Sequence, residues 1–284
     1  MYNLILENAA GDQLKFGMGT PFSIVEIQGL NPPAATVNTN QLALMDGAKY
    51  NSAKVEMRTI DIAFAIELDP PKNRIEVYKV LKSKQYVKVI YDGKYRHVYA
   101  EGYVTAIQIT YFDMKQIVTC SILCPDPFFK AMQESVTEVS TKINAFSFPF
   151  ASQSTPELVF GYYEDIQTVS VENDGDVSTG LIFELSASGY IRLPTIYDYE
   201  TNDLIQLDYS MQAGDVITID TNAGHKTVTL LRGGVESNIF NSVTKDSSWL
   251  QLPANGGTYV YNALFGNISD LKVTIRHTDL YEGV

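Results

Sequence analysis

The chain of 284 residues contains two cysteines, three histidines and one tryptophan, and each scarcity excludes a class of protein. Cys120 and Cys124 lie four residues apart in an extended segment. The rise of a strand separates their Cα atoms by roughly 13 Å, too far for a disulfide. We therefore expect two free thiols on one face of one strand, acting as small buried hydrophobic groups. A chain without a disulfide can fold in a reducing cytoplasm.

Residues that carry chemistry are also sparse. His97, His225 and His277 are far apart, and none belongs to a metal-binding spacing. The chain has no G-x-S-x-G elbow and no P-loop. Gly17-Met18-Gly19 begins like a dinucleotide fingerprint but lacks the third glycine and a βαβ context. We predict no catalytic residue, no cofactor-binding residue, no cofactor and no metal ligand, so the chain is not expected to be an enzyme.

Long apolar runs and excess positive charge are missing as well. The longest apolar stretches, such as residues 62–66, are bounded by Asp61 and Glu67, so we expect neither a membrane span nor membrane association. The N-terminal residues lack the basic and apolar regions of a signal peptide. Lys and Arg number 21 against 33 Asp and Glu, a net charge of −12. Such a surface repels phosphate, so specific nucleic-acid binding is not expected.

What the chain does have is a hydrophobic content of 45% and an alternation of period two. Ile60, Ile62, Phe64, Ile66 and Leu68 share one face of a half-buried strand. Residues 86–91 and 95–100 flank an Asp-Gly pair, which predicts a hairpin with a tight turn and a positive φ. Further strands are expected at 103–111 and 116–124.

One helix is predicted, at residues 72–82. Two prolines precede it, and lysines crowd its last turn, where they suit the helix dipole. Ile75, Tyr78 and Leu81 recur every three residues and predict its apolar stripe.

Residues 31–53 have no clean period and are rich in Pro, Asn and Thr. Two interpretations stay open: a long functional loop or arm, or a surface excursion with one short strand at residues 41–45.

Prolines at 125, 127, 149 and 156 mark a boundary, so we predict domains at residues 1–130 and 131–284. The first is expected to be β-sandwich-like with one helix and a hairpin. The second contains many short strands, at 167–173, 180–186, 191–195, 204–209, 216–220, 227–231, 249–252, 258–261 and 271–277. This spacing predicts a β-sandwich of the jelly-roll kind. The fold class is therefore mainly β.

Two features of the second domain carry alternative interpretations. Asn173-Asp174-Gly175-Asp176 gathers oxygen ligands suited to calcium, but a polar turn is favoured because the spacing of an EF-hand is absent. Trp249 could present an aromatic platform to a sugar, but packing against the core is favoured.

Several motifs, in order, resemble the distal tail (Dit) family of siphophages that infect Gram-positive bacteria. In the first half they include Met45-Asp46-Gly47, Arg58-Thr59-Ile60-Asp61-Ile62 and Cys124-Pro125-Asp126-Pro127. In the second half they include residues 173–177, 213–221 and 249–252. The likeness extends over nearly the whole chain.

The resemblance implies a structural role. The domain at residues 1–130 would form a hexameric ring at the tail tip, and residues 131–284 would be galectin-like. The ring would join the tail tube protein and the tape-measure protein to the tail-associated lysin or tip protein, and receptor-binding proteins would dock at its periphery. The implied location is the virion tail tip, after synthesis in the host cytoplasm. The alternative is a carbohydrate-binding module that recognises host cell-wall polysaccharide through the second domain.

Overall fold

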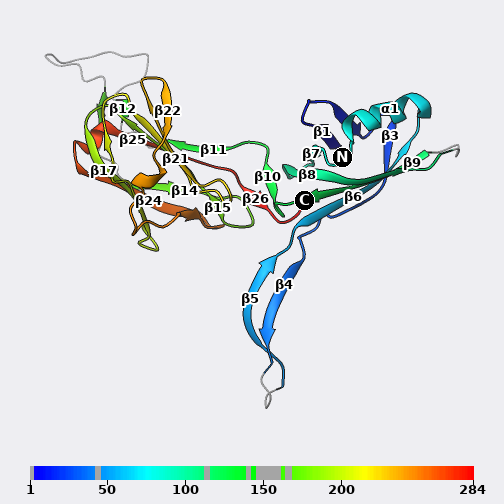
Figure 1. Cartoon of the computed structure of the whole chain (residues 1–284), viewed down its shortest axis with the longest axis horizontal. Helices are drawn as coiled ribbons and strands as arrows, with labels where there is room; N and C mark the ends of the chain where they lie inside the picture. The colour runs from blue at the N-terminus through cyan, green and yellow to red at the C-terminus, as the bar shows by residue number, and fades with distance from the viewer. Residues whose placement is uncertain (1–2, 42–45, 112–115, 139–141, 145–160, 164–167) are drawn as a thin grey trace, which may run out of the picture. The chain divides into compact units, whose positions relative to one another are not determined.

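The computed structural model describes residues 3–41, 46–111, 116–138, 142–144, 161–163 and 168–284 (Figure 1). Within them it contains 26 β-strands, one α-helix and two 3₁₀ helices. The predicted fold class, mainly β, is confirmed.

The chain divides into two compact units. Unit 1 comprises Met1–Met132 together with Leu280–Val284, and unit 2 comprises Gln133–Asp279. The sequence placed the division between residues 130 and 131 and gave the second domain the rest of the chain. In the structure the last five residues return to unit 1, because Leu280 and Tyr281 pair with a strand there.

Unit 1 is built on one nine-stranded antiparallel sheet. Its main path runs β2-β1-β7-β8-β9-β6-β3, and β10 and β26 extend it beside β8. The strands are β1 (Asn3–Asn8), β2 (Gln13–Phe16), β3 (Phe22–Gln28), β6 (Arg58–Ile66), β7 (Tyr86–Asp92), β8 (His97–Ile109), β9 (Gln116–Cys124), β10 (Phe129–Ala131) and β26 (Leu280–Tyr281).

Alternation of period two builds the core of unit 1. In β6 the even-numbered residues from 58 to 66 are buried, and in β9 they are those from 116 to 124. The predicted face of β6 is confirmed from Ile60 to Ile66, whereas Leu68 lies beyond the strand and is exposed. One sheet face thereby supplies a continuous apolar layer.

The sheet of unit 1 curls back on itself instead of facing a second sheet. Phe16 of β2 and Phe22 of β3 come from opposite ends of the path, yet their ring centroids are 5.9 Å apart. The Phe64 ring lies 4.9 Å from Phe16 and 5.8 Å from Phe22. The expected sandwich-like packing is thus achieved within a single curved sheet.

The helix α1 (Pro70–Val80) covers part of this core. Pro70 and Pro71 occupy its first turn, where their missing N–H groups have no helical partner to lose. The predicted apolar stripe is wrong at Ile75, which is 57% exposed, and at Tyr78, which is 38% exposed, whereas Leu81 is buried as predicted. Val77 and Val80 face the core instead, together with Leu81 just beyond the helix end.

The predicted hairpin exists, as β7 and β8, but its turn differs. Asp92 pairs with His97, so the loop has four residues, and the Gly93 N–H donates to the Arg96 carbonyl at 2.9 Å. Gly93 does not have the positive φ that the Asp-Gly pair predicts. A Cβ at Gly93 would lie 2.5 Å from Cε1 of Tyr91, so a side chain there would have to displace that ring.

Unit 2 contains a six-stranded and a five-stranded antiparallel sheet. The first has the order β11 (Ser135–Glu138), β25 (Leu271–His277), β16 (Ile182–Ala187), β20 (Val216–Asp220), β21 (Thr227–Arg232) and β22 (Val235–Asn238). The second has β14 (Thr168–Val171), β24 (Gly257–Phe265), β17 (Ile191–Asp198) and β18 (Leu204–Gln206), with β19 (Ser210–Met211) beside β17.

Short elements complete this unit: the pairs β15 (Thr179–Gly180) with β23 (Gln251–Leu252) and β12 (Lys142–Asn144) with β13 (Gly161–Tyr163), and the 3₁₀ helices η1 (Phe240–Ser242) and η2 (Ile268–Asp270).

The inner faces of the two large sheets form one core in unit 2. Phe183, Ile217 and Ile275 of the six-stranded sheet belong to the same buried cluster as Ile196 and Tyr259 of the five-stranded sheet. The Phe183 and Tyr259 rings meet edge to face, with centroids 5.8 Å apart. This is the β-sandwich that the many short strands predict.

Candidate assembly surface

The segment predicted as a loop or arm is a two-stranded antiparallel ribbon in unit 1. β4 (Ala35–Asn40) and β5 (Lys49–Val55) pair with each other and form a sheet of their own. Figure 1 shows the two strands leaving the sheet of unit 1 together. We call β4 and β5 the arm. Of the strand expected at residues 41–45, residues 42–45 lie outside the described part of the chain.

The register gives the arm two chemically different faces. Cross-strand partners share a face, so Ala35 with Val55 and Val37 with Ala53 make an apolar face. The register shifts between Asn38 and Thr39, and beyond the shift Thr39 pairs with Tyr50 on the continuation of that face. The opposite face is polar and basic, with the pairs Thr36–Lys54, Asn38–Ser52 and Asn40–Lys49.

Neither face of the arm is covered within the chain. Every residue of β4 is exposed, and so is every residue of β5 except Val55. Val37 is 54% and Tyr50 61% exposed. A lone two-stranded ribbon is marginally stable in water, because it has no third strand or opposing layer to pack on. The apolar face is therefore a surface suited to burial against another molecule.

The base of the arm is organised by Arg58, the first residue of β6. Its guanidinium is buried and donates to four main-chain carbonyls. Nη1 donates to Gly29 O at 2.5 Å and to Asn31 O at 2.7 Å, on the chain entering the arm. Nε donates to Pro127 O at 2.7 Å, and Nη2 to Glu282 O at 2.6 Å.

Burial and nearby charge act in opposite directions on Arg58. Burial lowers its pKa from the ordinary value, while nearby carboxylates, Asp126 and then Glu282, oppose that shift. The four carbonyl acceptors replace the water that the cation loses, as a buried charge requires. Arg58 therefore joins the arm base, the end of β9 and the last residues of the chain.

Residues 280–284 lie against the same base. Tyr281 pairs with Phe129, and the Arg96 guanidinium stacks on the Tyr281 ring with its carbon 4.6 Å from the centroid. Arg96 Nη1 also donates to Gly283 O. The Val284 N–H donates to Leu30 O at 3.2 Å.

The three histidines are placed apart. His97 binds the exposed Asp92 carboxylate beside the β7–β8 turn. His225 lies in the turn between β20 and β21. His277 is buried at the end of β25, with Nε2 3.2 Å from Asp279 Oδ1. Among the residues that the structure describes, no three His, Cys, Asp or Glu side chains gather in a metal-binding group.

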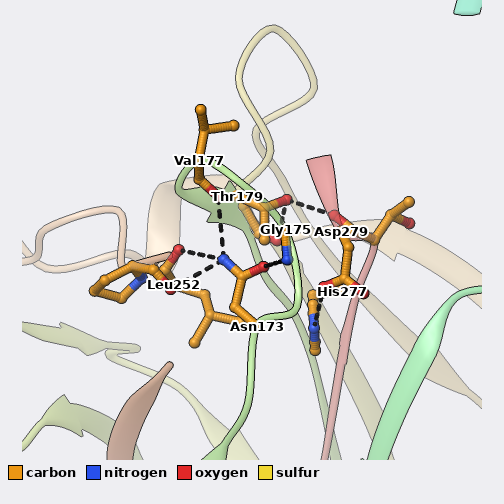
Figure 2. A network of polar contacts seen from close by, with 10 residues as sticks. Asn173, Gly175, Val177, Thr179, Leu252, His277 and Asp279 are labelled. Atoms are coloured by element: carbon orange, nitrogen blue, oxygen red, sulfur yellow. Dashed lines mark hydrogen bonds and ion pairs between the residues drawn. The ribbon is translucent and has the colours of Figure 1, made fainter. Parts of the chain in front are cut away.

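The segment considered for calcium forms a polar turn (Figure 2). Asn173 Oδ1 accepts from the Gly175 N–H at 2.9 Å, and Asn173 Nδ2 donates to Val177 O at 3.1 Å and Pro253 O at 2.9 Å. Nearby, the Thr179 hydroxyl donates to Thr278 O at 2.9 Å. The Asn173 amide thus connects this turn to the segment after β23 through hydrogen bonds within the protein.

Trp249 is half-buried and packs against the core of unit 2. The Phe240 ring stacks on it, with centroids 5.5 Å apart and planes 24° apart, and Lys226 Nζ lies 5.2 Å from its centroid. Its neighbours Leu250 and Leu252 are fully buried. The packing interpretation of Trp249 therefore agrees with its contacts.

Cys120 and Cys124 occupy the inner face of β9 and are both free and buried, as predicted. Burial is the main cause that raises the pKa of the Cys120 thiol to about 12 and that of Cys124 to about 11. Gly17 and Gly19 lie in the loop between β2 and β3. None of the helices in the described parts of the chain is long and apolar enough to cross a membrane.

Comparison with known proteins connects this architecture to phage tails. Residues 174–281 match the family model described as siphovirus-type tail component, C-terminal domain. Residues 174–281 are thus similar to the C-terminal domain of a siphovirus-type tail component, and the predicted resemblance to the Dit family is confirmed. No protein in a search of curated proteins matches.

Solved structures extend the likeness in fold to the whole chain. The crystal structure of the Dit protein (gp 19.1) of phage SPP1, titled a paradigm of hub adsorption apparatus in phages that infect Gram-positive bacteria, aligns with a TM-score of 0.69 at 16% identity over 98% of each chain. A chain of the phage P2 baseplate in its activated conformation with calcium aligns with a TM-score of 0.52 at 11% identity over 100% of each. The strontium form gives 0.51 at 12% identity over 100% of each.

Arg58 is the residue of this region whose role the sequence reasoning missed. In the sequence, Arg58 stands out only as the first residue of a motif shared with the Dit family. The signal was available, because Arg58 continues the inward register of Ile60 and Ile62. A charge on the buried face of a strand requires several hydrogen-bond acceptors, so this pattern indicates a polar network around Arg58.

Proposed function

We propose that this chain is a structural component of a siphophage tail tip, and that copies of it assemble through unit 1 into a closed, hexameric ring. The observation that carries this proposal is the arm, whose apolar face is uncovered and lies opposite a polar face. A ring needs one surface of each copy to contact a different surface of the next, and the arm supplies the first of these.

The domain match and the fold support the rest of the proposal. The ring would connect the tail tube and tape-measure proteins to the lysin or tip protein, with receptor-binding proteins at the periphery. Its place would be the tail tip of a virion whose proteins are made in a bacterial cytoplasm. The role requires no catalysis. The carbohydrate alternative has weaker support, because Phe240 stacks on the Trp249 ring that would serve as its platform.

Light scattering coupled to gel filtration, with negative-stain microscopy, tests the assembly of the purified full chain. We expect rings for the natural chain and monomers for the double variant Val37→Ser, Tyr50→Ser, which removes the apolar face. The matched control is Asn38→Ser, Lys54→Ser, on the polar face, which should still assemble. Both variants should melt near the natural temperature, because the four side chains are exposed in the monomer. A natural chain that stays monomeric overturns the proposal.

A further inference from the structure

We propose that residues 280–284 act as a latch that fixes the base of the arm. We call this segment the tail latch. The inference concerns the chain itself, and only its consequence for assembly rests on the proposed function. It is carried by two contacts between the arm base and these five residues, and by a third contact that holds the same residues from the other side.

The first contact is shared through Arg58. Two donors of its guanidinium hold Gly29 O and Asn31 O, where the chain enters the arm, and a third holds Glu282 O in the tail latch. Because the guanidinium is planar and rigid, its donors are positioned together. Displacing the tail latch leaves a buried N–H of Arg58 without its acceptor, so seating the latch and ordering the arm base are energetically coupled.

The second contact is direct. The Val284 N–H donates to Leu30 O at 3.2 Å. Gly283 is buried so closely against the entering chain that a Cβ there would lie 3.1 Å from Pro32 Cδ and 3.2 Å from Leu30 O. No side chain larger than hydrogen fits between the two segments without moving one of them.

The third contact holds the tail latch from the other side. Arg96 stacks on Tyr281 and donates to Gly283 O. β26 itself contributes only two paired residues, Leu280 with Lys130 and Tyr281 with Phe129. A segment held by so short a ladder opens more readily than the central strands. Its attachment therefore depends on the two arginines and on the packing of Tyr281 and Val284 against the core.

Other contacts also hold the chain that enters the arm. Leu30 packs against the core of unit 1, and Gly29, with a φ of +87°, approaches β6 so closely that a Cβ would lie 2.1 Å from Thr59 O. The Glu56 N–H joins the two strands of the arm to each other by donating to Ala34 O at 2.9 Å. Asn31 and Pro32, which lead into the arm, are met by Arg58 and by Gly283 of the tail latch.

Spin labels on the full chain test the inference. Asn38→Cys in the arm and Lys15→Cys in β2 are both exposed, while the native thiols are buried and will not be labelled. Pulsed electron resonance then measures the distance between the labels, with labelled chain diluted into unlabelled chain. We expect one narrow distribution with the native tail latch and a broad one with Gly283→Val or Arg96→Gln.

The control is Val104→Ala, a core substitution in β8 away from the arm base, which should lower the melting temperature and leave the distribution narrow. A narrow, unshifted distribution in both latch variants would overturn the inference, as would equal broadening in the control. Dilution removes distances between chains, and the same latch variants made in the Val37→Ser, Tyr50→Ser background remove any ordering of the arm by a neighbouring copy. A monomeric natural chain would therefore refute the proposed ring without affecting this measurement.

Discussion

The Arg58 guanidinium lies over the Phe129 ring, with its carbon 4.3 Å from the ring centroid. Phe129 is fully buried, so a positive charge sits against the apolar core of unit 1. The ring face attracts the cation, and four carbonyls accept hydrogen bonds from its nitrogens. One residue therefore stabilises the core and orders the arm base.

Arg58→Met should destabilise unit 1 strongly. The substitution keeps an apolar stem on Phe129 but removes the donor from four part-buried hydrogen bonds to carbonyls, which should cost about 3 kcal/mol. Urea denaturation followed by circular dichroism measures the loss. The matched control is Arg192→Met, whose partner Asp208 is largely exposed and whose ion pair should contribute less than about 1 kcal/mol. Equal losses in the two variants would contradict the role given to Arg58.

Asn173→Ala should destabilise unit 2 by about 1–3 kcal/mol, because it removes the buried donor to Val177 O and Pro253 O. Asn173→Asp keeps the acceptor for the Gly175 N–H but not the donors, so it should be destabilised as well. Thermal unfolding compares both with Asn238→Ala, an exposed site. Calcium should leave all melting temperatures unchanged, and a rise with calcium in the natural chain alone would restore the metal interpretation.

Cys120 and Cys124 should be unreactive at pH 8 in the folded chain and both reactive in urea. Burial holds their pKa values at about 12 and about 11, so almost no thiolate is present when the chain is folded. Titration with a thiol-disulfide reagent counts the accessible groups. One thiol reacting at full rate without denaturant would show that β9 opens.

The same pKa values predict a loss of stability in alkali. The unfolded chain releases these protons near pH 9, whereas the folded chain keeps them until about pH 11 to 12. Because the folded state then binds more protons, the free energy of unfolding falls as pH rises through this window. The variant Cys120→Ala, Cys124→Ala should show a shallower fall between pH 9 and 11 in urea titrations, although it starts from a lower stability.

Asp215 should contribute stability that disappears in acid. Its carboxylate is buried and accepts two bonds from Arg232, which lower its pKa below the ordinary value. A depressed pKa stabilises the fold above about pH 4, and that contribution is lost as pH falls through the folded value. Asp215→Asn should therefore melt lower than the natural chain at neutral pH, and the gap should shrink near pH 2. The exposed Asp208→Asn serves as the control.

Sequence patterns predict those elements in which one face is buried. β9, β20 and β25 have the bounds that alternation indicates, because each side chain has a definite inside or outside. The strands of the arm escaped prediction for the opposite reason. Both of their faces are exposed in the isolated chain, so Thr and Asn replace the apolar period that would mark a strand.

Errors in detail arose where tertiary contacts override a local rule. The three-residue stripe of α1 missed Val77 and Val80, since the side of the helix that meets the sheet depends on where the sheet lies. The Asp-Gly pair predicts a positive φ at Gly93, whereas in the structure the constraint on this position is the Tyr91 ring, which a side chain would have to displace. The role of Arg58 depends on four carbonyls, of residues 29, 31, 127 and 282. These residues are far apart in the sequence, so no local pattern shows that they meet.

The chain enters unit 2 after Met132 and leaves it at Asp279, and the strands on the unit 1 side of these two points are neighbours, with Lys130 paired to Leu280. Unit 2 is thus an insertion between adjacent strands. A short turn could replace it, since closing so narrow a gap costs little loop entropy. By the same reasoning, recombination could exchange unit 2 for another domain without changing the strand order of the sheet in unit 1.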